Sequence, residues 1–252
     1  MQDTATAVVP DCPLSAPGGG VRGSVGGGRV SLASGQVLPY DWLVLSLGAT
    51  ARLEVVPGAR EHAIPFLTLD DVTRVQEALS NAQAAKDATG GRGVTVAVVG
   101  ASLAGVELAA AVASVVGKQG GRVALLAGGP TVMPENTDTQ RSAAEAALTR
   151  AGVEVVPSRR VASITAIDGS EAACRYSIDF QAADGSEPPP PLAADVVLWT
   201  AGQRPAGKEL LGPEWLDAAL GGISTDTCLR VRCVTRRRTC IIPLPAPTHI
   251  VF

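Results

Sequence analysis

The stretch VTVAVVGASLAGVELAAAVA, from Val94 to Ala113, constrains the fold more than any other part of the sequence. Residues 94–99 are almost entirely apolar and rich in β-branched side chains, as in a parallel strand buried on both faces. Gly100 ends this run, and small apolar residues at helical spacing follow. A strand, a glycine turn and a helix in this order form the context that a dinucleotide fingerprint requires. The unpaired amides of the first helical turn and the helix dipole would together hold a diphosphate.

The fingerprint departs from the G-x-G-x-x-G pattern at one position. Gly100 and Gly105 occupy its first and third glycine positions, and Ser102 occupies the second, where a dinucleotide comes closest to the backbone. The Cβ of Ser102 either weakens binding, or its hydroxyl donates a hydrogen bond to a phosphate oxygen. The segment alone is also compatible with a glycine turn in a flavodoxin-like sheet that binds no dinucleotide.

Glu107 lies close to the start of the predicted helix and has two interpretations. An acid in the first turn is a favourable partner for the helix dipole, whatever the protein does. Beside a diphosphate the same carboxylate would be repulsive. A functional role would therefore place it toward the nicotinamide ribose, and the sequence leaves both interpretations open.

The segment after the second predicted strand, residues 123–126, bears on the choice between NADH and NADPH. NAD-selective sites usually place an acid here that bonds the ribose hydroxyls. This chain continues with Ala127, Gly128 and Gly129, so neither a carboxylate nor an arginine follows the strand directly. We expect NADPH to be tolerated at least as well as NADH, with the preference open.

Capping residues and periodicity predict the other elements. Thr68 to Asp71 fits a capping box, which predicts a helix to about Lys86, and Thr137 or Asp138 is expected to cap another helix. Alternating polarity predicts an antiparallel hairpin from residues 161–167 and 174–181, with a turn around Gly169. The remaining predicted elements are a connector over residues 52–65 and strands over 29–33, 42–47, 153–156 and 194–200.

Two of these strands end in turns of small residues, on either side of the nucleotide unit. Trp42 to Leu47 stops at Gly48, and residues 194–200 run into Ala201-Gly202. Small residues at a strand tip allow a backbone to press against a ligand, although each turn alone is an ordinary strand end. This pattern predicts an α/β fold in which a Rossmann-like NAD(P)-binding domain is inserted into another domain.

Composition limits the classes of function. The net charge of −3 gives no general reason to expect a nucleic-acid partner. The five cysteines contain no C-x-x-C pair, which argues against a redox-active disulfide and against a zinc site, so no metal is expected. The sequence contains no run of 18 apolar residues, so it predicts no transmembrane helix. Met1 is followed by no basic region, so no signal or transit peptide is visible.

From about Gln36 to Val231, the chain resembles the type II NAD(P)H:quinone oxidoreductases, flavoproteins with two dinucleotide-binding domains. YDWLVLSLGAT resembles the family's first flavin-contacting strand and turn, and GASLAGVELA its NAD(P)H fingerprint, in which serine is a known variant. ADVVLWTAGQRP resembles its second contact strand, and TDTCLRV the segment before its last flavin motif. The connector VVPGAREHAIPFLTLDDVTRVQEAL is most similar to the plastid branch of plants and algae, the demethylphylloquinone reductase-like enzymes.

The resemblance implies an oxidoreductase that transfers electrons from NAD(P)H through FAD to a membrane quinone. The cofactors supply this chemistry, so no catalytic side chain is expected. The implied domains are a partial FAD-binding domain with connector (1–92), an NAD(P)H-binding Rossmann domain (93–200), and a return to the FAD-binding domain with an atypical tail (201–252). The implied cofactor contacts are Gly100, Ala101, Ser102, Leu103, Ala104 and Gly105, with Glu107, Ala201 and Gly202 near the nicotinamide, and Ser46, Leu47, Gly48 and Ala49 at the flavin.

The chain also departs from the family. No flavin-binding strand, glycine loop and helix precede Gln36, and no Gly-Asp pair follows Val231. The tail RCVTRRRTCIIPLPAPTHIVF contains no amphipathic helix of the kind that carries quinone and peripheral membrane contacts in the full-length family. We therefore expect an incomplete product. By resemblance, the compartment would be the chloroplast or the mitochondrion, and a homodimer remains open.

Two functional hypotheses follow from these departures. The first is an NAD(P)H:quinone oxidoreductase with a complete flavin site. The alternative is a truncated, non-catalytic NAD(P)H-binding module that lacks a complete FAD site. A disulfide reductase is disfavoured because the sequence has no C-x-x-C pair.

Overall fold

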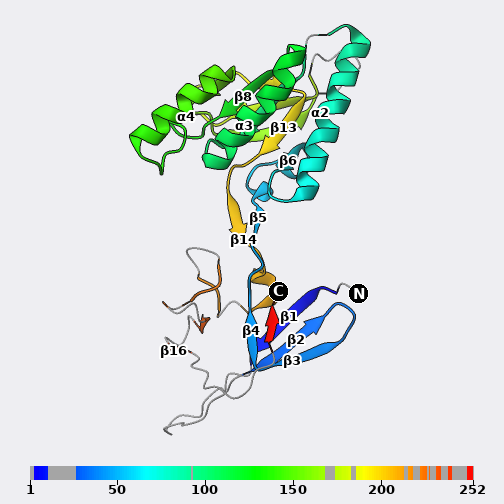
Figure 1. Cartoon of the computed structure of the whole chain (residues 1–252), viewed down its shortest axis with the longest axis vertical. Coiled ribbons are helices and arrows are strands. Elements are labelled where there is room, and N and C mark those ends of the chain that lie inside the picture. The colour runs from blue at the N-terminus through cyan, green and yellow to red at the C-terminus, as the bar shows by residue number, and fades with distance from the viewer. Residues whose placement is uncertain are drawn as a thin grey trace. The chain divides into compact units, whose positions relative to one another are not determined.

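The computed structural model describes residues 3–10, 27–91, 93–167, 174–182, 186–212, 215–217, 222–225, 227, 231–233, 238–239 and 249–251. The chain divides into two compact units (Figure 1). Residues 51–203 form one unit, and residues 1–50 with 204–252 form the other. Each unit is described by itself below.

The 51–203 unit is built on a five-stranded sheet in which every neighbouring pair of strands is parallel. The strand order is β6-β13-β7-β8-β9. The bounds are β6 (Ala63–Pro65), β7 (Thr95–Val99), β8 (Arg122–Leu126), β9 (Val153–Val156) and β13 (Val196–Trp199). The predicted strands at 94–99, 123–126, 153–156 and 194–200 are confirmed as members of this sheet.

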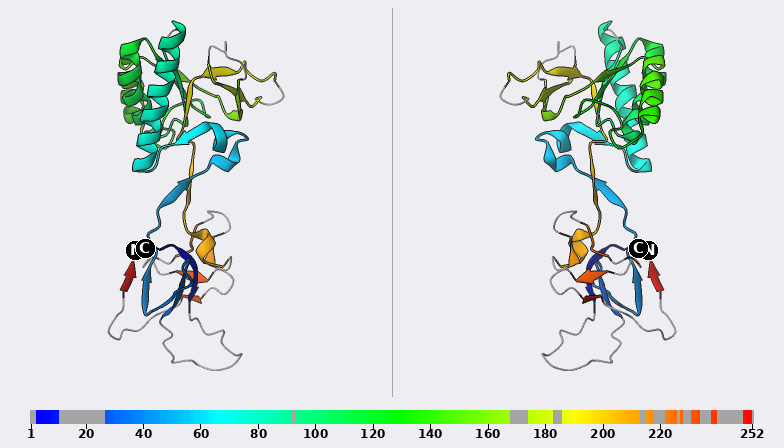
Figure 2. Two further views of the ribbon diagram at one scale, coloured as in Figure 1. Left: turned by 90° about the vertical axis from the view of Figure 1, so that its right-hand side faces the viewer. Right: turned by 90° about the vertical axis from the view of Figure 1, so that its left-hand side faces the viewer.

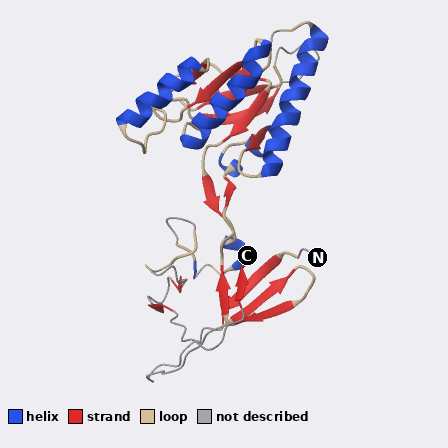
Figure 3. Cartoon of the chain, viewed as in Figure 1, coloured by secondary structure: helices blue, strands red, loops and turns tan. Residues whose placement is uncertain are grey.

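Both faces of this sheet are covered, which explains the continuous apolar runs of its central strands. Successive side chains of a strand point to opposite faces. Val96 and Val98 of β7 accordingly belong to one core, and Ala97 and Val99 belong to another. Figure 2 shows helices on one face of the sheet and a small antiparallel sheet on the other, and in Figure 3 the helices lie in front of the parallel strands.

Three helices supply the first core: α2 (Leu69–Thr89), α3 (Leu103–Val116) and α4 (Asp138–Arg150). Both predicted helix starts are confirmed. The Thr68 hydroxyl accepts the amide of Asp71 in a capping box. Thr137, not Asp138, caps α4, and its box partner is Gln140. Helix α2 continues three residues beyond the predicted end at Lys86 and stops at Gly90.

An antiparallel sheet supplies the second core. It consists of β10 (Val161–Ala166), β11 (Tyr176–Phe180) and β12 (Leu192–Ala194). The first two strands confirm the predicted hairpin, whose expected turn at Gly169 lies outside the described residues. Ile164 and Ile178 are fully buried against the parallel sheet.

The predicted connector over residues 52–65 has more structure than its sequence indicates. It contains the 3-10 helix η1 (Leu53–Val55), the short helix α1 (Ala59–His62) and β6, which joins the parallel sheet beside β13. Strand β6 has only three residues and ends in proline, so it is too short to show an alternation of polar and apolar residues in the sequence. The compact unit therefore includes this connector and begins at Ala51.

The other unit is mainly β-structure among its described residues. Its elements are β1 (Ala5–Pro10), β2 (Gly28–Leu32), β3 (Val37–Tyr40), β4 (Trp42–Val44), the 3-10 helix η3 (Lys208–Leu210), β15 (Arg232–Cys233), β16 (Arg238–Thr239) and β17 (His249–Val251). Strands β1 to β3 form an antiparallel sheet, and β4 pairs with β17 in parallel. The predicted strand over 42–47 ends earlier, at Val44, and Leu43 and Leu45 both pack against the core that contains Trp215. Strands β5 (Ala49–Ala51) and β14 (Gln203–Pro205) pair where the chain passes between units.

Candidate functional site

The glycine turn between β7 and α3 leaves no room for side chains at its two glycines. A Cβ at Gly105 would lie 1.8 Å from the carbonyl oxygen of Gly100, and one at Gly100 would lie 2.7 Å from the amide nitrogen of Ala201. Gly100 also has a φ of 106°, which disfavours other residues. The Thr200 hydroxyl lies 3.0 Å and 2.8 Å from the carbonyl oxygens of Val99 and Gly100. Both glycines are therefore required for α3 to start against the end of the sheet.

Ser102 is the N-cap residue of α3, but its side chain makes no capping hydrogen bond. Its backbone is extended, and the residue is exposed. Leu103 and Ala104, which open the 14-residue helix, are exposed as well. No acidic side chain lies in the first turn of α3. The start of this helix thus presents backbone amides, a serine hydroxyl and the positive end of the helix dipole to an anion.

A cavity of about 350 Å³ lies at this helix start. Its size is within the range of small-molecule sites, about 300–1,000 Å³. Glu135 is the only charged side chain among its lining residues. The lining comes from the glycine turn, the loop after β8 and the segment before α4: Ala101, Ser102, Leu103, Ala104, Ala127, Gly128, Gly129, Thr131, Met133, Pro134, Glu135 and Asn136.

The other predicted NAD(P)H contacts do not line this cavity. Gly105 is buried against Gly100 and acts through the shape of the turn. Glu107 is exposed in α3 beyond the first turn. Ala201 and Gly202 follow β13, where the Gly202 carbonyl accepts the amide of Arg52 at 3.2 Å. Four of these predicted contacts, residues 101–104, thus line the cavity, whereas Gly100 and Gly105 form the turn behind it and Ala201 packs against Gly100.

The sequence did not predict that the segment from Thr131 to Asn136 would line the cavity. Its key residue is Met133, whose amide donates to the carbonyl of Ala101 at 2.7 Å and whose φ is 46°. Val132 and Met133 are buried, which fixes the segment against the glycine turn. Sequence patterns could not predict this turn, because glycine or asparagine, not methionine, is the residue expected at a positive φ.

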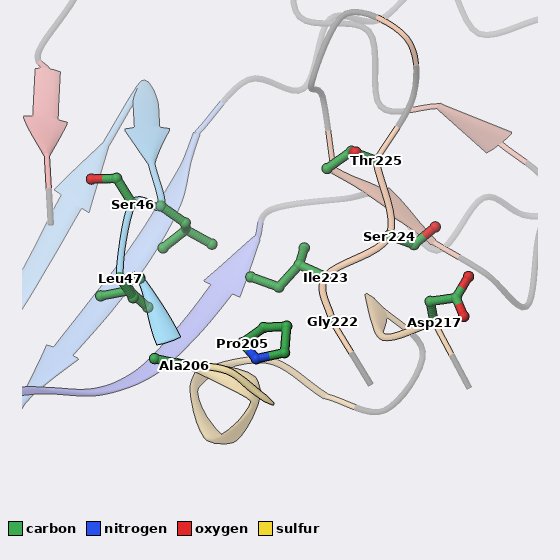
Figure 4. A pocket seen from close by; sticks show the side chains of 11 residues that line it. Ser46, Leu47, Pro205, Ala206, Asp217, Gly222, Ile223, Ser224 and Thr225 are labelled. Carbon is green, nitrogen blue, oxygen red and sulfur yellow. The ribbon is translucent and has the colours of Figure 1, made fainter. Parts of the chain in front are cut away.

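A second cavity, of about 470 Å³, lies within the other unit (Figure 4). The predicted flavin contacts Ser46, Leu47 and Gly48 line it, whereas Ala49 begins β5 and does not. The amide of Ala206 donates to the carbonyl of Gly48 at 3.0 Å, which joins two walls of the cavity. The lining residues are Leu45, Ser46, Leu47, Gly48, Pro205, Ala206, Asp217, Gly222, Ile223, Ser224 and Thr225.

The described residues fit the two expected cofactors unequally. The glycine turn and exposed start of α3 fit the diphosphate of a nicotinamide dinucleotide. In the unit of residues 1–50 and 204–252, the described part contains no α-helix that follows a glycine turn. That part therefore fits a contact with a flavin at Ser46 to Gly48, but not the diphosphate half of FAD.

The described ranges also bear on two other classes of site. There, no group of His, Cys, Asp and Glu side chains is placed to hold a metal ion. No described helix combines the length and apolar character needed to cross a bilayer. A buried ion pair between Lys86 and Asp195 lies at the opposite edge of the parallel sheet from the cavity, where β7 and β13 begin.

Comparison with known proteins agrees with this architecture. A family model described as pyridine nucleotide-disulphide oxidoreductase matches residues 20–236. The chain is 40% identical over 219 residues to the alternative NAD(P)H-ubiquinone oxidoreductase C1, chloroplastic/mitochondrial, of Arabidopsis thaliana, covering 84% of this chain and 42% of that protein. It is 30% identical over 165 residues to the demethylphylloquinone reductase NdbB of Synechocystis sp., covering 66% of this chain and 37% of that protein.

Solved structures show the same fold. NDH2 from Plasmodium falciparum in complex with RYL-552 has a TM-score of 0.68 at 15% identity, covering 93% of this chain and 47% of that chain. The same protein in complex with NADH has a TM-score of 0.61 at 14% identity, covering 83% and 42%. These likenesses confirm the predicted α/β fold with a parallel sheet.

The matches cover only part of each curated relative. The chain spans about two fifths of the length of the curated relatives described above. The family model nevertheless covers most of this chain, including the glycine turn and both cavities. The chain therefore belongs to the pyridine nucleotide-disulphide oxidoreductase family, among relatives of the type II NAD(P)H:quinone oxidoreductases that its motifs resemble.

Proposed function

We propose that the 51–203 unit binds NAD(P)H in the cavity at the start of α3. The observation that carries this proposal is the glycine turn, where a Cβ at Gly105 would lie 1.8 Å from the Gly100 carbonyl oxygen. Such close packing exposes the first amides of the helix beside a cavity of about 350 Å³. The chain would thus supply the NAD(P)H-binding part of an NAD(P)H:quinone oxidoreductase.

Residues of the cavity would bind and orient the dinucleotide. The amides of Leu103 and Ala104, with the Ser102 hydroxyl, would hold the diphosphate. The loop from Ala127 to Gly129 would lie beside the adenosine ribose, because it follows the second strand of the βαβ unit. The chemistry that bound NAD(P)H supplies is hydride transfer, which needs orientation rather than a catalytic side chain.

The electron acceptors belong to the same proposal. Ser46, Leu47 and Gly48 would contact a flavin, and Ala49, Ala201, Gly202 and Glu107 remain predicted contacts. The terminal acceptor would be a quinone, in agreement with the names of the two curated relatives. The chloroplast or mitochondrion would be the compartment, as the name of the Arabidopsis relative indicates for that protein.

A non-catalytic NAD(P)H-binding module is the second candidate function. The specific observation in its favour is the lack of a glycine turn and α-helix in the described part of the 1–50 and 204–252 unit. Without such a turn, those residues offer no site for the diphosphate of FAD. The two candidates share the NAD(P)H site and differ only in the flavin.

A titration with a matched pair of variants tests the NAD(P)H site. Ala104 lines the cavity, and Ala111 is exposed farther along the same helix. Ala104→Asp places a negative charge against the diphosphate and should weaken NADPH and NADH binding by about tenfold, whereas Ala111→Asp should change it by less than about twofold. Calorimetric titration of the purified chain measures both. Equal affinities in the two variants, or no binding by the unaltered chain, would overturn the proposal.

The visible absorption of the same preparation separates the two candidate functions. A stoichiometric flavin spectrum that NAD(P)H bleaches and a quinone restores supports the oxidoreductase. NAD(P)H binding without flavin, even after incubation with FAD, supports the module.

A further inference from the structure

We propose that residues 187–192, with the sequence EPPPPL, form an exposed polyproline II helix that docks into a groove of a partner protein, and that this groove is lined by aromatic side chains and has a basic rim. The segment connects β11 and β12 of the antiparallel sheet. None of its residues lines either cavity, so the inference does not depend on the proposed NAD(P)H site.

The sequence of this segment restricts its backbone to one conformation. Four prolines, Pro188 to Pro191, follow Glu187. Each proline ring fixes its own φ at about −65°, and each residue before a proline is kept out of the α-helical region. No described peptide bond is cis, and residues 187–191 belong to no α-helix or strand. Consecutive trans prolines form a polyproline II helix, which has roughly three residues per turn and rises about 3.1 Å per residue.

The exposure of the side chains repeats with the period of this helix. Pro189 and Leu192 lie one turn apart on the same side and are both half-buried, and Leu192 packs against the core beneath the antiparallel sheet. Pro188 and Pro191 share a second side and are exposed. The third side, formed by Glu187 and the remaining proline, is exposed as well. One side of the helix therefore faces the protein, and the other two sides are open to a partner.

Strand β12 holds the end of the segment in place. Leu192 is the first residue of this strand and pairs with Ile178 of β11. Ala194, its last residue, is fully buried. The amide of the next residue, Asp195, donates to the carbonyl of Thr95 in the parallel sheet at 2.8 Å. Because the segment is both stiff and anchored, a partner that binds it has little conformational entropy to remove.

Protection of a sheet edge accounts for only part of the proline run. Strand β12 is an outer strand of its sheet, and proline ends pairing at such an edge because it has no amide hydrogen. The pairing between β11 and β12 stops at Leu192, although β11 continues to Phe180. A single proline at position 191 is enough for this. The further prolines create a Pro-x-x-Pro pattern, with Pro188 and Pro191 exposed on one side, which is the pattern that aromatic-lined grooves bind.

The charge of the segment indicates the rim of the groove. Glu187 is exposed and is the only charged residue from Ser186 to Ala194. Grooves that bind polyproline II helices occur in SH3, WW and EVH1 domains. Since the segment carries an acid and no lysine or arginine, a groove with basic side chains at its rim complements it.

The test is a calorimetric titration of the full chain with purified SH3, WW and EVH1 domains, using for each class a domain whose groove has a basic rim. At least one of them should form a one-to-one complex. Pro188→Ala and Pro191→Ala should each weaken this binding by at least about fivefold, because each removes a ring from the exposed side. Glu187→Gln should weaken it by about threefold and reduce its dependence on salt.

Pro189→Ala is the matched control, because it removes one proline from the same run on the side that faces the protein. It should change the affinity by less than about twofold. Equal losses in Pro189→Ala and Pro191→Ala would overturn the proposal, since the exposed side would then have no special role. Circular dichroism of each variant verifies that the fold is intact.

Two further outcomes would overturn the proposal. One is that no domain of the three classes binds the unaltered chain. The other is self-association of the chain in sedimentation velocity that Pro191→Ala abolishes, because the segment would then be covered by a second copy of this chain.

Discussion

Asp71 is a buried carboxylate that fixes the start of α2. Its carboxylate accepts the amides of Leu67 at 3.0 Å and Thr68 at 2.9 Å, and the Thr68 hydroxyl accepts the amide of Asp71 at 3.2 Å. Burial acts to raise the pKa of Asp71, but the hydrogen bonds outweigh it and hold the pKa below its ordinary value. The folded state therefore favours the ionised form.

Asp71→Asn should lower the free energy of unfolding by about 1–2 kcal/mol at neutral pH, because it removes a charged cap. A lowered pKa in the folded state contributes stability that is complete above the unfolded pKa of about 4 and is lost as the pH falls through the folded value. The difference between the variant and the unaltered chain should therefore shrink in acid. Urea titrations at about pH 7 and about pH 3 measure it.

Asp70→Asn is the control for this prediction, because Asp70 lies in the same turn but is exposed. It should cost no more than about 0.5 kcal/mol. An equal cost of Asp71→Asn at both pH values would contradict the role assigned to the ionised carboxylate.

Individual residues of the candidate site differ in how well the sequence predicts them. Gly100 and Gly105 were predictable, because only glycine tolerates the close contacts of the turn. Met133 and Glu135 were not, because a tertiary hydrogen bond to Ala101 sets the conformation of their segment. The charge of the site thus depends on a residue that local patterns do not connect to it.

At the scale of elements, one buried ion pair joins α2 to the parallel sheet. The Lys86 ammonium lies 3.0 Å from the Asp195 carboxylate, and their side chains are 16% and 4% exposed. The second carboxylate oxygen accepts the amide of Thr95, the first residue of β7, at 2.8 Å. Burial and the charge of Asp195 also raise the pKa of the nearby Cys174 thiol. One carboxylate thus connects the last turn of α2 with the starts of β7 and β13.

Asp195→Asn should destabilise the protein by about 1–3 kcal/mol, because it removes the negative charge that lies against the largely buried Lys86 ammonium. The matched control is Asp138→Asn, which breaks the pair with Arg141 where the carboxylate is 94% exposed. This control should cost at most about 1 kcal/mol. Thermal denaturation of both variants measures the difference. Equal costs would mean that the Lys86 pair stabilises no more than a surface pair does.

Short elements were the ones that the sequence did not predict. The long helices α2 and α4 have capping boxes, and β7 has a continuous apolar run, so each was predictable from local residues. Strands β6 and β12 have three residues each and take their conformation from pairing with β13 and β11. Such strands owe their existence to partners distant in the chain, so periodicity cannot detect them.

At the scale of the whole molecule, the 51–203 unit contains all that its two cores need. Every residue of the core between the helices and the parallel sheet lies within this range, and so does every residue of the core beneath the antiparallel sheet. The cavity at the start of α3 is also lined only from this range. The unit is therefore expected to fold, and to bind NAD(P)H, without the rest of the chain.

Two fragments test this independence. Residues 51–203 should unfold cooperatively in urea and bind NADH as tightly as the full chain, within about twofold. Residues 93–200 match the predicted nucleotide domain but lack β6 and α2. Their removal turns β13 into an edge strand and uncovers Val196 and Leu198, which pack in the same core as Val75 and Ala82 of α2. This shorter fragment should aggregate or stay unfolded, and equal folding of the two would contradict a structural role for the connector.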